Sequence, residues 1–470
     1  ILSKKVTKKV LKPSKTLKEM DQNQLCLVDS IIPGEPAQIS FFGNGNCSNE
    51  TVNIYLNGTH NNVEKDLYKG AGLKAVKDFE EESHILICTL GCFMNKSLNM
   101  DNILKSQSPG HTAFVNKKIL SDQIKKYETS HPNNHSIIPA TYQIPQQLSQ
   151  LIEDNKTYNG FYIRKPSASS RGRGIELVKY LEEMQYNESA IVQRYEEDLV
   201  LINGFKFDMR VYVLVTNIDP LIVYFYPEGL ARFASHPFQK PTFENYKDLK
   251  MHLTNFAVNS EDHLIKKLTP EMDNKWTLQQ MIDYLQDHQE LFDKSAPKIT
   301  KKYLLDEIKA TLEKTFVATY TESLKISKNY LPKQIPTKYF GVYGADLCLL
   351  TNGKMKIFEV NVGPSLDTQN QLDFDVKFPM LREALDLVGL RSKPFEFKEQ
   401  QADEEAFNEW FDDTLDITEK RVLMQLVDEQ LRQHRWVRLN VWESLLNQGK
   451  WNQLVHRNKQ LIKKELTKRR

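Results

Sequence analysis

Residues 345–361 read ADLCLLTNGKMKIFEVN, and this stretch indicates how the central part of the chain folds. Two apolar runs, 345–350 and 356–360, lie on either side of the dipeptide Asn352-Gly353. Asn-Gly between two alternating strands is a strong signal for a β-hairpin. The sequence therefore predicts a hairpin whose strands come close together.

Polar side chains lie on this predicted hairpin. Glu359 and Asn361 are two residues apart on the second strand, so both side chains project from one face. Asp346 lies on the first strand and can approach them across the turn. Carboxylate and amide oxygens are the ligands that Mg²⁺ prefers when it bridges nucleotide phosphates. The hairpin therefore predicts a magnesium site, with a solvated polar sheet face as the alternative.

Strands and helices are both expected in the rest of the chain. Apolar runs bounded by turn residues predict strands over 160–165, 175–178, 190–195, 209–216 and 221–226. Apolar residues at helical spacing predict helices over 117–127, 278–292, 303–320, 376–389 and 417–434. Residues 85–93 fit either a buried strand or the start of a helix. The fold class is therefore mixed α/β.

A basic, glycine-rich loop follows the first of these strands. The strand ends in Lys165, and residues 167–174 read SASSRGRG. Glycine permits close approach of the backbone, and Lys and Arg neutralise phosphate charge, so the segment favours a loop folded over phosphates. It lacks the GxxxxGK[ST] pattern of a P-loop. Taken alone, it is equally typical of a surface turn or an RNA-like basic patch.

A third polar group occurs in residues 206–210, KFDMR. Lys206, Asp208 and Arg210 alternate with apolar residues and would face one side of a strand, where they must pair or bind a ligand. By itself, His252 is more typical of a hydrogen-bonded structural histidine than of a catalytic base. Further polar residues beside apolar neighbours are Gln193, Tyr195, Arg232, Thr254 and Asn255.

Composition and charge narrow the class of protein. The 470 residues are 40% hydrophobic and 26% charged, with a formal net charge of +2, which excludes a wholly disordered chain. No apolar run approaches the roughly 20 residues of a membrane-spanning helix. Basic stretches at 3–18 and 463–470 indicate an anionic partner or solvated tails. Five cysteines form no disulfide framework and indicate a reducing compartment.

Taken in order, several segments resemble the tubulin tyrosine ligase-like family of ATP-grasp ligases. The resemblance covers residues 85–390, and the continuation through 372–389 is similar to the glutamylases rather than the glycylases. Residues 415–445 resemble the region after the catalytic core in one subgroup of glutamylases. The matching segments are YIRKP (162–166), SSRGRGI (169–175), KFDMRVYVLVT (206–216), EGLARF (228–233), HLTN (252–255) and FEVNVGPSL (358–366).

This resemblance implies a fold and a reaction. The fold would be an ATP-grasp fold in which the nucleotide lies between two sheets, followed by a helical C-terminal extension. ATP, with Mg²⁺, would phosphorylate the γ-carboxylate of a glutamate in a tubulin C-terminal tail. The amino group of free L-glutamate would then attack the acyl phosphate and form an isopeptide-linked branch. Cations and Mg²⁺, rather than a protein nucleophile, would stabilise the developing charge.

The resemblance also implies roles for individual residues. Arg232, Lys165 and Glu359 would act on the reacting groups. The Mg²⁺ ligands would be Asp346, Glu359 and Asn361, and the carboxylates of the amino-acid substrate would contact Arg232, Lys275 and Lys377. Nucleotide-binding positions are matched by Lys165, Arg171, Gly172, Gln193, Tyr195, Lys206, Asp208, Thr254 and Asn255.

The expected organisation and setting follow from the same likeness. The partners would be tubulin or microtubules, without nucleic acid or membrane, and the chain would be a monomer in the cytoplasm at the cytoskeleton, including the cilium or basal body. The expected units are an N-terminal basic segment (1–80), N-terminal, central and C-terminal subdomains (81–158, 159–235 and 236–395), an acidic linker (396–415) and a basic helical extension that is a candidate microtubule contact (416–470).

Two departures from the family pattern leave alternatives open. Phe256-Ala257 replaces the usual Tyr-Ser, which removes two hydroxyls, and Asn102-Ile103-Leu104 replaces the usual Asn-His-Phe. One alternative is a ligase that uses glycine or a non-tubulin acceptor, and another is a microtubule-binding scaffold with a degenerate ligase core. Lys377 separates glutamate from glycine, because glycine has no side-chain carboxylate for it to bind.

Overall fold

The structure is a computed structural model, and it describes most of the chain between residues 104 and 388 together with shorter segments on either side. Among the described residues, no helix has the length and apolarity needed to cross a lipid bilayer. The described residues are 28–30, 43–47, 53–57, 74–76, 85–88, 104–107, 109–132, 135–167, 172–184, 186, 188–259, 274–330, 339–366, 368, 370–388, 422, 425–426, 429–430 and 432–441.

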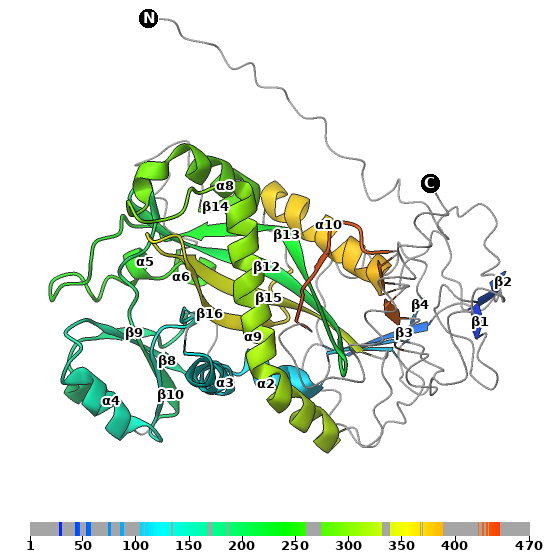
Figure 1. Ribbon diagram of the computed structural model, residues 1–470, viewed down its shortest axis with the longest axis horizontal. Coiled ribbons are helices and arrows are strands. Elements are labelled where there is room, and N and C mark those ends of the chain that lie inside the picture. Colours follow the sequence, from blue (N-terminus) through cyan, green and yellow to red (C-terminus); the bar gives the residue numbers. More distant parts are fainter. Residues whose placement is uncertain are drawn as a thin grey trace, which may run out of the picture.

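A large sheet runs through the centre of the molecule (Figure 1). Its strand order is β14-β13-β12-β15-β6-β5-β3-β4, with β11 beside β12, β16 beside β15 and β17 beside β13. Two antiparallel hairpins form its middle and pair with each other through β12 and β15. The antiparallel strands are β11 (Leu201–Ile202), β12 (Phe205–Ile218), β13 (Leu221–Phe233), β14 (Lys275–Thr277), β15 (Tyr339–Leu349), β16 (Met355–Val362) and β17 (Val437–Arg438).

The hairpin predicted from residues 345–361 is confirmed. β15 and β16 pair antiparallel around the Asn352-Gly353 turn, where Gly353 has a φ of +81° that glycine adopts without a steric penalty. The register places Asp346 directly opposite Glu359. The sequence signal for this turn therefore identified both the fold and the two facing carboxylates.

The strands from the N-terminal part extend the large sheet in parallel. β6 (Leu104–Ser106) pairs with β15, and β5 (Ile85–Cys88) continues from it, so the start of the 85–93 run is a strand. β3 (Asn53–Asn57) and β4 (Lys74–Val76) complete this edge. A separate antiparallel pair consists of β1 (Val28–Ser30) and β2 (Gly43–Cys47).

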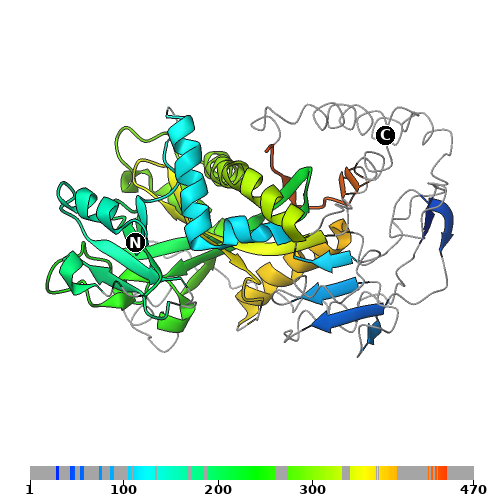
Figure 2. The same ribbon diagram turned by 90° about the horizontal axis from the view of Figure 1, so that it is seen from below.

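A smaller antiparallel sheet lies beside the large one (Figure 2). Its order is β7-β10-β8-β9, and the helix α4 (Leu148–Asn155) packs on it. Asp154 of this helix accepts hydrogen bonds from the Tyr162 hydroxyl at 2.8 Å and from Arg194, which fixes the helix to the sheet. The strands are β7 (Thr141–Ile144), β8 (Tyr162–Pro166), β9 (Glu176–Val178) and β10 (Ala190–Arg194).

Helices cover both faces of the large sheet. The long helix α9 (Lys301–Tyr330) crosses one face, with α3 (Lys117–Ser130) beside it, while α10 (Gln371–Leu387) lies on the other face (Figure 2). Four side chains of α9 recur every four residues and are fully buried, namely Leu304, Ile308, Leu312 and Phe316. Burial of each contributes roughly 1.5–3 kcal/mol to the free energy of unfolding. The remaining helices are the 3-10 turn η3 (Pro109–His111), α2 (Thr112–Val115), the 3-10 turn η4 (Leu181–Glu183), α5 (Leu249–His252), α6 (Phe256–Asn259), α8 (Leu278–Asp287) and the 3-10 turn η5 (Gln289–Leu291).

Part of the C-terminal segment packs into the same core. Val422 and Leu426 are helical and fully buried, as predicted for an amphipathic helix over 417–434, but the prediction is wrong at its end, because residues 432–434 form turns and irregular structure. Glu429 is also buried and accepts hydrogen bonds from Thr216 at 2.9 Å and Tyr224 at 2.8 Å, and burial raises its pKa to about 7. β17 then pairs with β13. Val422, Leu426, Glu429 and β17 therefore pack against the folded core.

Several sequence predictions lie outside the described residues. They are the basic stretches 3–18 and 463–470, the acidic linker 396–415, Arg171, the side chains of Phe256-Ala257, and Asn102-Ile103 of the second departure.

Candidate active site

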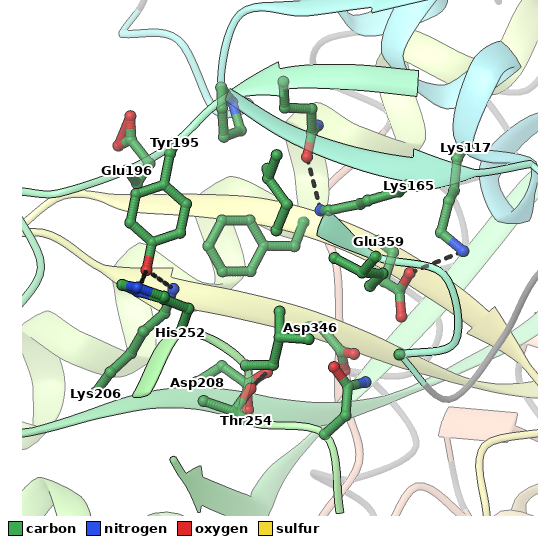
Figure 3. A pocket seen from close by; sticks show the side chains of 18 of the residues that line it. Lys117, Lys165, Tyr195, Glu196, Lys206, Asp208, His252, Thr254, Asp346 and Glu359 are labelled. Carbon is green, nitrogen blue, oxygen red and sulfur yellow. Dashed lines mark hydrogen bonds and ion pairs between the residues drawn. The ribbon is translucent and has the colours of Figure 1, made fainter. Parts of the chain in front are cut away.

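A cleft opens between the two sheets and receives side chains from both (Figure 3). It contains about 890 Å³ of empty space, part of which is open to solvent. Apart from Arg171, every residue predicted to bind nucleotide or metal lines this cleft, namely Lys165, Gly172, Gln193, Tyr195, Lys206, Asp208, Thr254, Asn255, Asp346, Glu359 and Asn361.

Two buried lysines, the lysine pair, reach the cleft from different sheets. Lys165 on β8 donates a hydrogen bond to Gln193 Oε1 at 2.7 Å, and Lys206 on β12 donates to the Tyr195 hydroxyl at 2.9 Å. Burial lowers the pKa of each lysine to about 8. Both hydrogen-bond acceptors are uncharged, so the lysine pair supplies positive charge that an anionic ligand would balance.

The predicted magnesium ligands meet on the large sheet. The Asn361 amide donates to Asp346 Oδ2 at 3.2 Å and to Glu359 Oε1 at 3.1 Å. Within the described residues, no group of three or more His, Cys, Asp or Glu side chains is placed to hold a metal ion. A magnesium site here therefore consists of two carboxylates and one amide, and needs further oxygen ligands from substrate or water.

A β-bulge explains why Phe358 also lines the cleft. The register of β15 and β16 shifts between Asp346 and Leu347, so that Leu347 pairs with Ile357 while Asp346 pairs with Glu359. Such a bulge interrupts the alternation of side chains along a strand. Phe358 therefore joins Glu359 at the cleft, and Lys165 Nζ lies 5.2 Å from the centre of its ring.

A row of ion pairs continues across the large sheet. Arg232 on β13 bonds Asp208 on β12 through two nitrogen atoms, and its Nη2 lies 2.9 Å from Asp346 Oδ2. Arg210 binds the same Asp346 carboxylate at 2.5 and 3.0 Å. Burial alone would raise the pKa of Asp346, but the two arginines hold it well below its usual value. Of the charges predicted to pair or to bind a ligand on the 206–210 strand, Asp208 and Arg210 form ion pairs, whereas Lys206 donates to a hydroxyl at the cleft.

The other cations predicted to bind substrate lie farther along the same sheet. Lys275 on β14 is the strand partner of Arg232, and its Nζ lies 2.9 Å from Asp373 on α10. Lys377, one turn later on α10, lies 3.2 Å from the same completely buried carboxylate. We call Arg210, Arg232, Lys275 and Lys377, with Asp208, Asp346 and Asp373, the ion-pair row.

None of the three cations predicted to bind the amino acid lines the cleft itself. Arg232, Lys275 and Lys377 are held by carboxylates of the chain, and all three are largely buried behind the cleft wall. Asp373, which joins two of them, was not predicted. A signal for it exists in the sequence, because Asp373 and Lys377 are four residues apart in a helix-like segment, a spacing that pairs opposite charges.

The structure adds cleft residues that sequence patterns did not indicate. Lys117, at the start of α3, forms an ion pair with Glu359 at 3.2 Å. Its spacing in the sequence carries no information about Glu359, since only the packing of α3 brings the two together. The apolar lining includes Pro139, Ile163, Ile175 and Leu253 as well as Phe358, and offers a surface for a flat ring.

The basic loop reaches the cleft through its glycine. Gly172 lines the site and has a φ of +79°, and Gly174 has a φ of +69°. A Cβ atom at Gly172 would lie 3.0 Å from Val258 Cγ2. The chain at this point therefore needs glycine for both its backbone conformation and its close packing.

These features fit the nucleotide and the metal that the resemblance implies. Two desolvated ammonium groups, an apolar slot and two facing carboxylates are the donor types that phosphates, an aromatic base and a hard divalent cation require. The distances between these groups are set by strands of two sheets, so the site is preformed by the fold.

Comparison with known proteins agrees with this chemistry. The profile of the tubulin-tyrosine ligase family matches residues 96–401, which is well over half of the chain. The chain therefore belongs to the tubulin-tyrosine ligase family, and its mixed α/β architecture with antiparallel sheets agrees with the ATP-grasp fold of such ligases.

Curated relatives carry more specific names. The chain is 30% identical over 327 residues to mouse tubulin polyglutamylase TTLL13, an alignment that covers 68% of this chain and 39% of the relative. It is 34% identical over 257 residues to human tubulin polyglutamylase TTLL5, an alignment that covers 54% of this chain and 19% of the relative. It is 27% identical over 352 residues to human tubulin polyglutamylase TTLL7, an alignment that covers 73% of this chain and 39% of the relative. The aligned part of this chain is thus well under half the length of these relatives.

Proposed function

We propose that this chain is an ATP- and Mg²⁺-dependent ligase that adds L-glutamate to the γ-carboxylate of glutamates in tubulin C-terminal tails. The family membership supports a ligase, and the names of the relatives support glutamate as the amino acid and tubulin as the acceptor. The observation that carries the proposal is the lysine pair, which faces the hairpin carboxylates across one cleft.

The side chains of the cleft suit the chemistry of such a ligase. Lys165 and Lys206 would bind phosphate oxygens, because each is a buried ammonium whose own acceptor is uncharged. Asp346, Glu359 and Asn361 would hold Mg²⁺, which when bound would withdraw charge from the phosphates. Arg232, held beside Asp346, would stabilise negative charge that develops on the acceptor carboxylate.

The ion-pair row would select the amino acid. Lys275 and Lys377 match the positions that hold the carboxylates of the amino-acid substrate in the family, and both are held in place by one buried carboxylate, Asp373. Glycine lacks the side-chain carboxylate, and we therefore propose glutamate. The predicted subdomain boundaries, a monomeric state and a microtubule contact in the extension belong to the same proposal.

The experiment is to incubate the chain with microtubules, ATP, Mg²⁺ and labelled L-glutamate, and to locate the label by mass spectrometry of tubulin tails. We expect label on glutamate side chains of the tails, and no label with Glu359→Gln. No incorporation, with the parent indistinguishable from Glu359→Gln, would contradict the proposal. Tight microtubule binding without incorporation would favour the scaffold instead, and label from glycine would favour the glycine-using ligase.

A further inference from the structure

Three polar side chains from separate elements form a hydrogen-bonded chain at one end of the cleft (Figure 3). Lys206 of β12 donates to the hydroxyl of Tyr195, which directly follows β10, at 2.9 Å. The same hydroxyl lies 3.0 Å from Nδ1 of His252, the last residue of α5. All three side chains are at least 95% buried, with exposed fractions of 5%, 5% and 1%. We call this chain the Lys206–Tyr195–His252 relay.

The direction of each hydrogen bond in the relay follows from its chemistry. A lysine ammonium only donates, so the Tyr195 oxygen accepts from Lys206 and its own hydrogen is left for His252 Nδ1. Nδ1 therefore accepts, and the single hydrogen of the neutral imidazole is on Nε2. Burial lowers the pKa of His252 to about 4. Its Nε2 is buried and has no hydrogen-bond partner among the described residues. Every polar group in the relay therefore has one assigned role.

Among the described residues, the relay provides the hydrogen-bond acceptor of the Lys206 ammonium group. Lys206 is also near Asp208 on its own strand, Cys348 on β15, Lys165 on β8 and Glu196 after β10, but it forms its hydrogen bond with Tyr195. Its ammonium nitrogen also lies 4.5 Å from the centre of the Tyr195 ring. Without the Tyr195 hydroxyl, a buried charged amine would have no acceptor, which is costly.

We propose that Tyr195 and His252 are positioning residues, which hold the Lys206 ammonium charged and directed into the cleft for a phosphate ligand. Because Tyr195 belongs to the small sheet while Lys206 belongs to the large one, the relay also joins the two walls of the cleft. The proposal rests on the proposed nucleotide site, and it adds a role for His252 that its isolated sequence position did not indicate.

The test is the pH dependence of ADP binding in the presence of Mg²⁺, measured by calorimetry between pH 6.5 and 9. For the parent, affinity should fall as pH rises through the region near 8, where Lys206 loses its proton. In Tyr195→Phe the acceptor of the ammonium is lost, so this fall should begin about one pH unit lower. The variant should bind ADP about 5-fold more weakly than the parent at pH 8 and nearly as well at pH 6.5.

Three further variants separate a positioning role of the relay from a role in folding. In His252→Ala, the fall in ADP affinity should also begin at a lower pH than in the parent, but by less than in Tyr195→Phe. His252→Asn keeps an acceptor oxygen near the place of Nδ1, and its ADP affinity should depend on pH as in the parent. Tyr162→Phe is the matched control, because it removes a tyrosine hydroxyl of the same sheet that bonds Asp154 away from the cleft, and it should leave the profile unchanged. ¹⁵N NMR of the parent should show His252 protonated at Nε2 only.

Several results would overturn the relay. One is superposition of the Tyr195→Phe and parent profiles, and another is an equal loss of affinity at every pH, which a merely structural role would give. An Nδ1-protonated His252 would also exclude the assigned directions. If the parent bound no ADP, the nucleotide site itself would be wrong, whereas ADP binding with superimposed profiles would remove the relay alone.

Discussion

The buried cations at the lysine pair and in the ion-pair row have different kinds of partner. Lys165 and Lys206 donate to an amide oxygen and a hydroxyl, whereas Arg232 and Lys275 are held by carboxylates of the chain itself. The lysine pair therefore keeps its charge for a ligand. In the ion-pair row, most of the positive charge is neutralised by carboxylates of the chain, and these ion pairs fix the geometry of the row. The acceptor of each buried cation thus distinguishes charge that is left for a ligand from charge that is held mainly by the chain.

Removal of one carboxylate from the ion-pair row should have the largest effect. Asp346→Asn leaves Arg210 and Arg232 buried without their shared counter-charge, and we expect the free energy of unfolding to fall by about 3–5 kcal/mol. Denaturant unfolding measures this. The control is Asp306→Asn, an exposed partner of Lys302, which should change stability by no more than about 0.5 kcal/mol. An equal loss of unfolding free energy in Asp346→Asn and Asp306→Asn would show that the ion-pair row does not stabilise the fold more than an exposed ion pair does.

Removal of a cation from the lysine pair should affect binding instead. Lys165→Met should weaken ADP binding by about 100-fold, the equivalent of roughly 2–3 kcal/mol for a hydrogen-bonded charge. The free energy of unfolding should fall by less than about 1 kcal/mol, because the lost charge had no ion pair and Gln193 loses one neutral hydrogen bond. Lys302→Met, on the exposed face of α9, is the control and should bind like the parent.

The lysine pair also predicts how stability depends on pH. The pKa of each lysine is about 8 in the folded chain, below the value near 10.4 of an unfolded lysine. Between these values the unfolded chain binds more protons, so the free energy of unfolding rises with pH. We expect each lysine to contribute about 1–2 kcal/mol between pH 8 and 9.5. The double variant Lys165→Met/Lys206→Met should lack this rise, and an identical rise in both proteins would contradict the assignment.

The smallest expected effect concerns the loop that reaches the lysine pair. Gly172→Ala should lower the free energy of unfolding by about 1 kcal/mol, because its φ of +79° disfavours a side chain. Gly204→Ala is a matched control, since Gly204 has a φ of +80° but no atom within 4 Å of an added Cβ. Both should lose similar stability, but only Gly172→Ala should weaken ADP binding, because its Cβ would contact Val258. Equal binding by both variants would show that the loop is not part of the site.

The local sequence predicted the hairpin and the lysine pair well. Asn352-Gly353 marks the turn of the hairpin, and the three-residue loop 351–353, together with the bulge at Phe358, brings Asp346 opposite Glu359. Alternation along β12 likewise placed Lys206 and Asp208 on one face. These features depend on neighbours in the sequence or across one turn, which is the information that a single chain carries.

Other parts of the site depend on contacts that a single sequence does not specify. Lys117 meets Glu359 only because α3 packs beside β16, and Phe358 reaches the cleft only because of a bulge. Asp373 was also missed as the partner of Lys275, since it approaches from α10, 98 residues later in the sequence. Long-range packing therefore accounts for what the motifs left out.

The C-terminal strand β17 has a practical consequence for how this protein is divided. Because β17 adds to the edge of β13, and Trp436 beside it is fully buried, a chain cut before Val422 would expose apolar core and leave Tyr224 without its acceptor. Such a shortened chain would be expected to misfold rather than merely to lose a tubulin-binding tail. A deletion that probes microtubule contact should therefore begin after Val441.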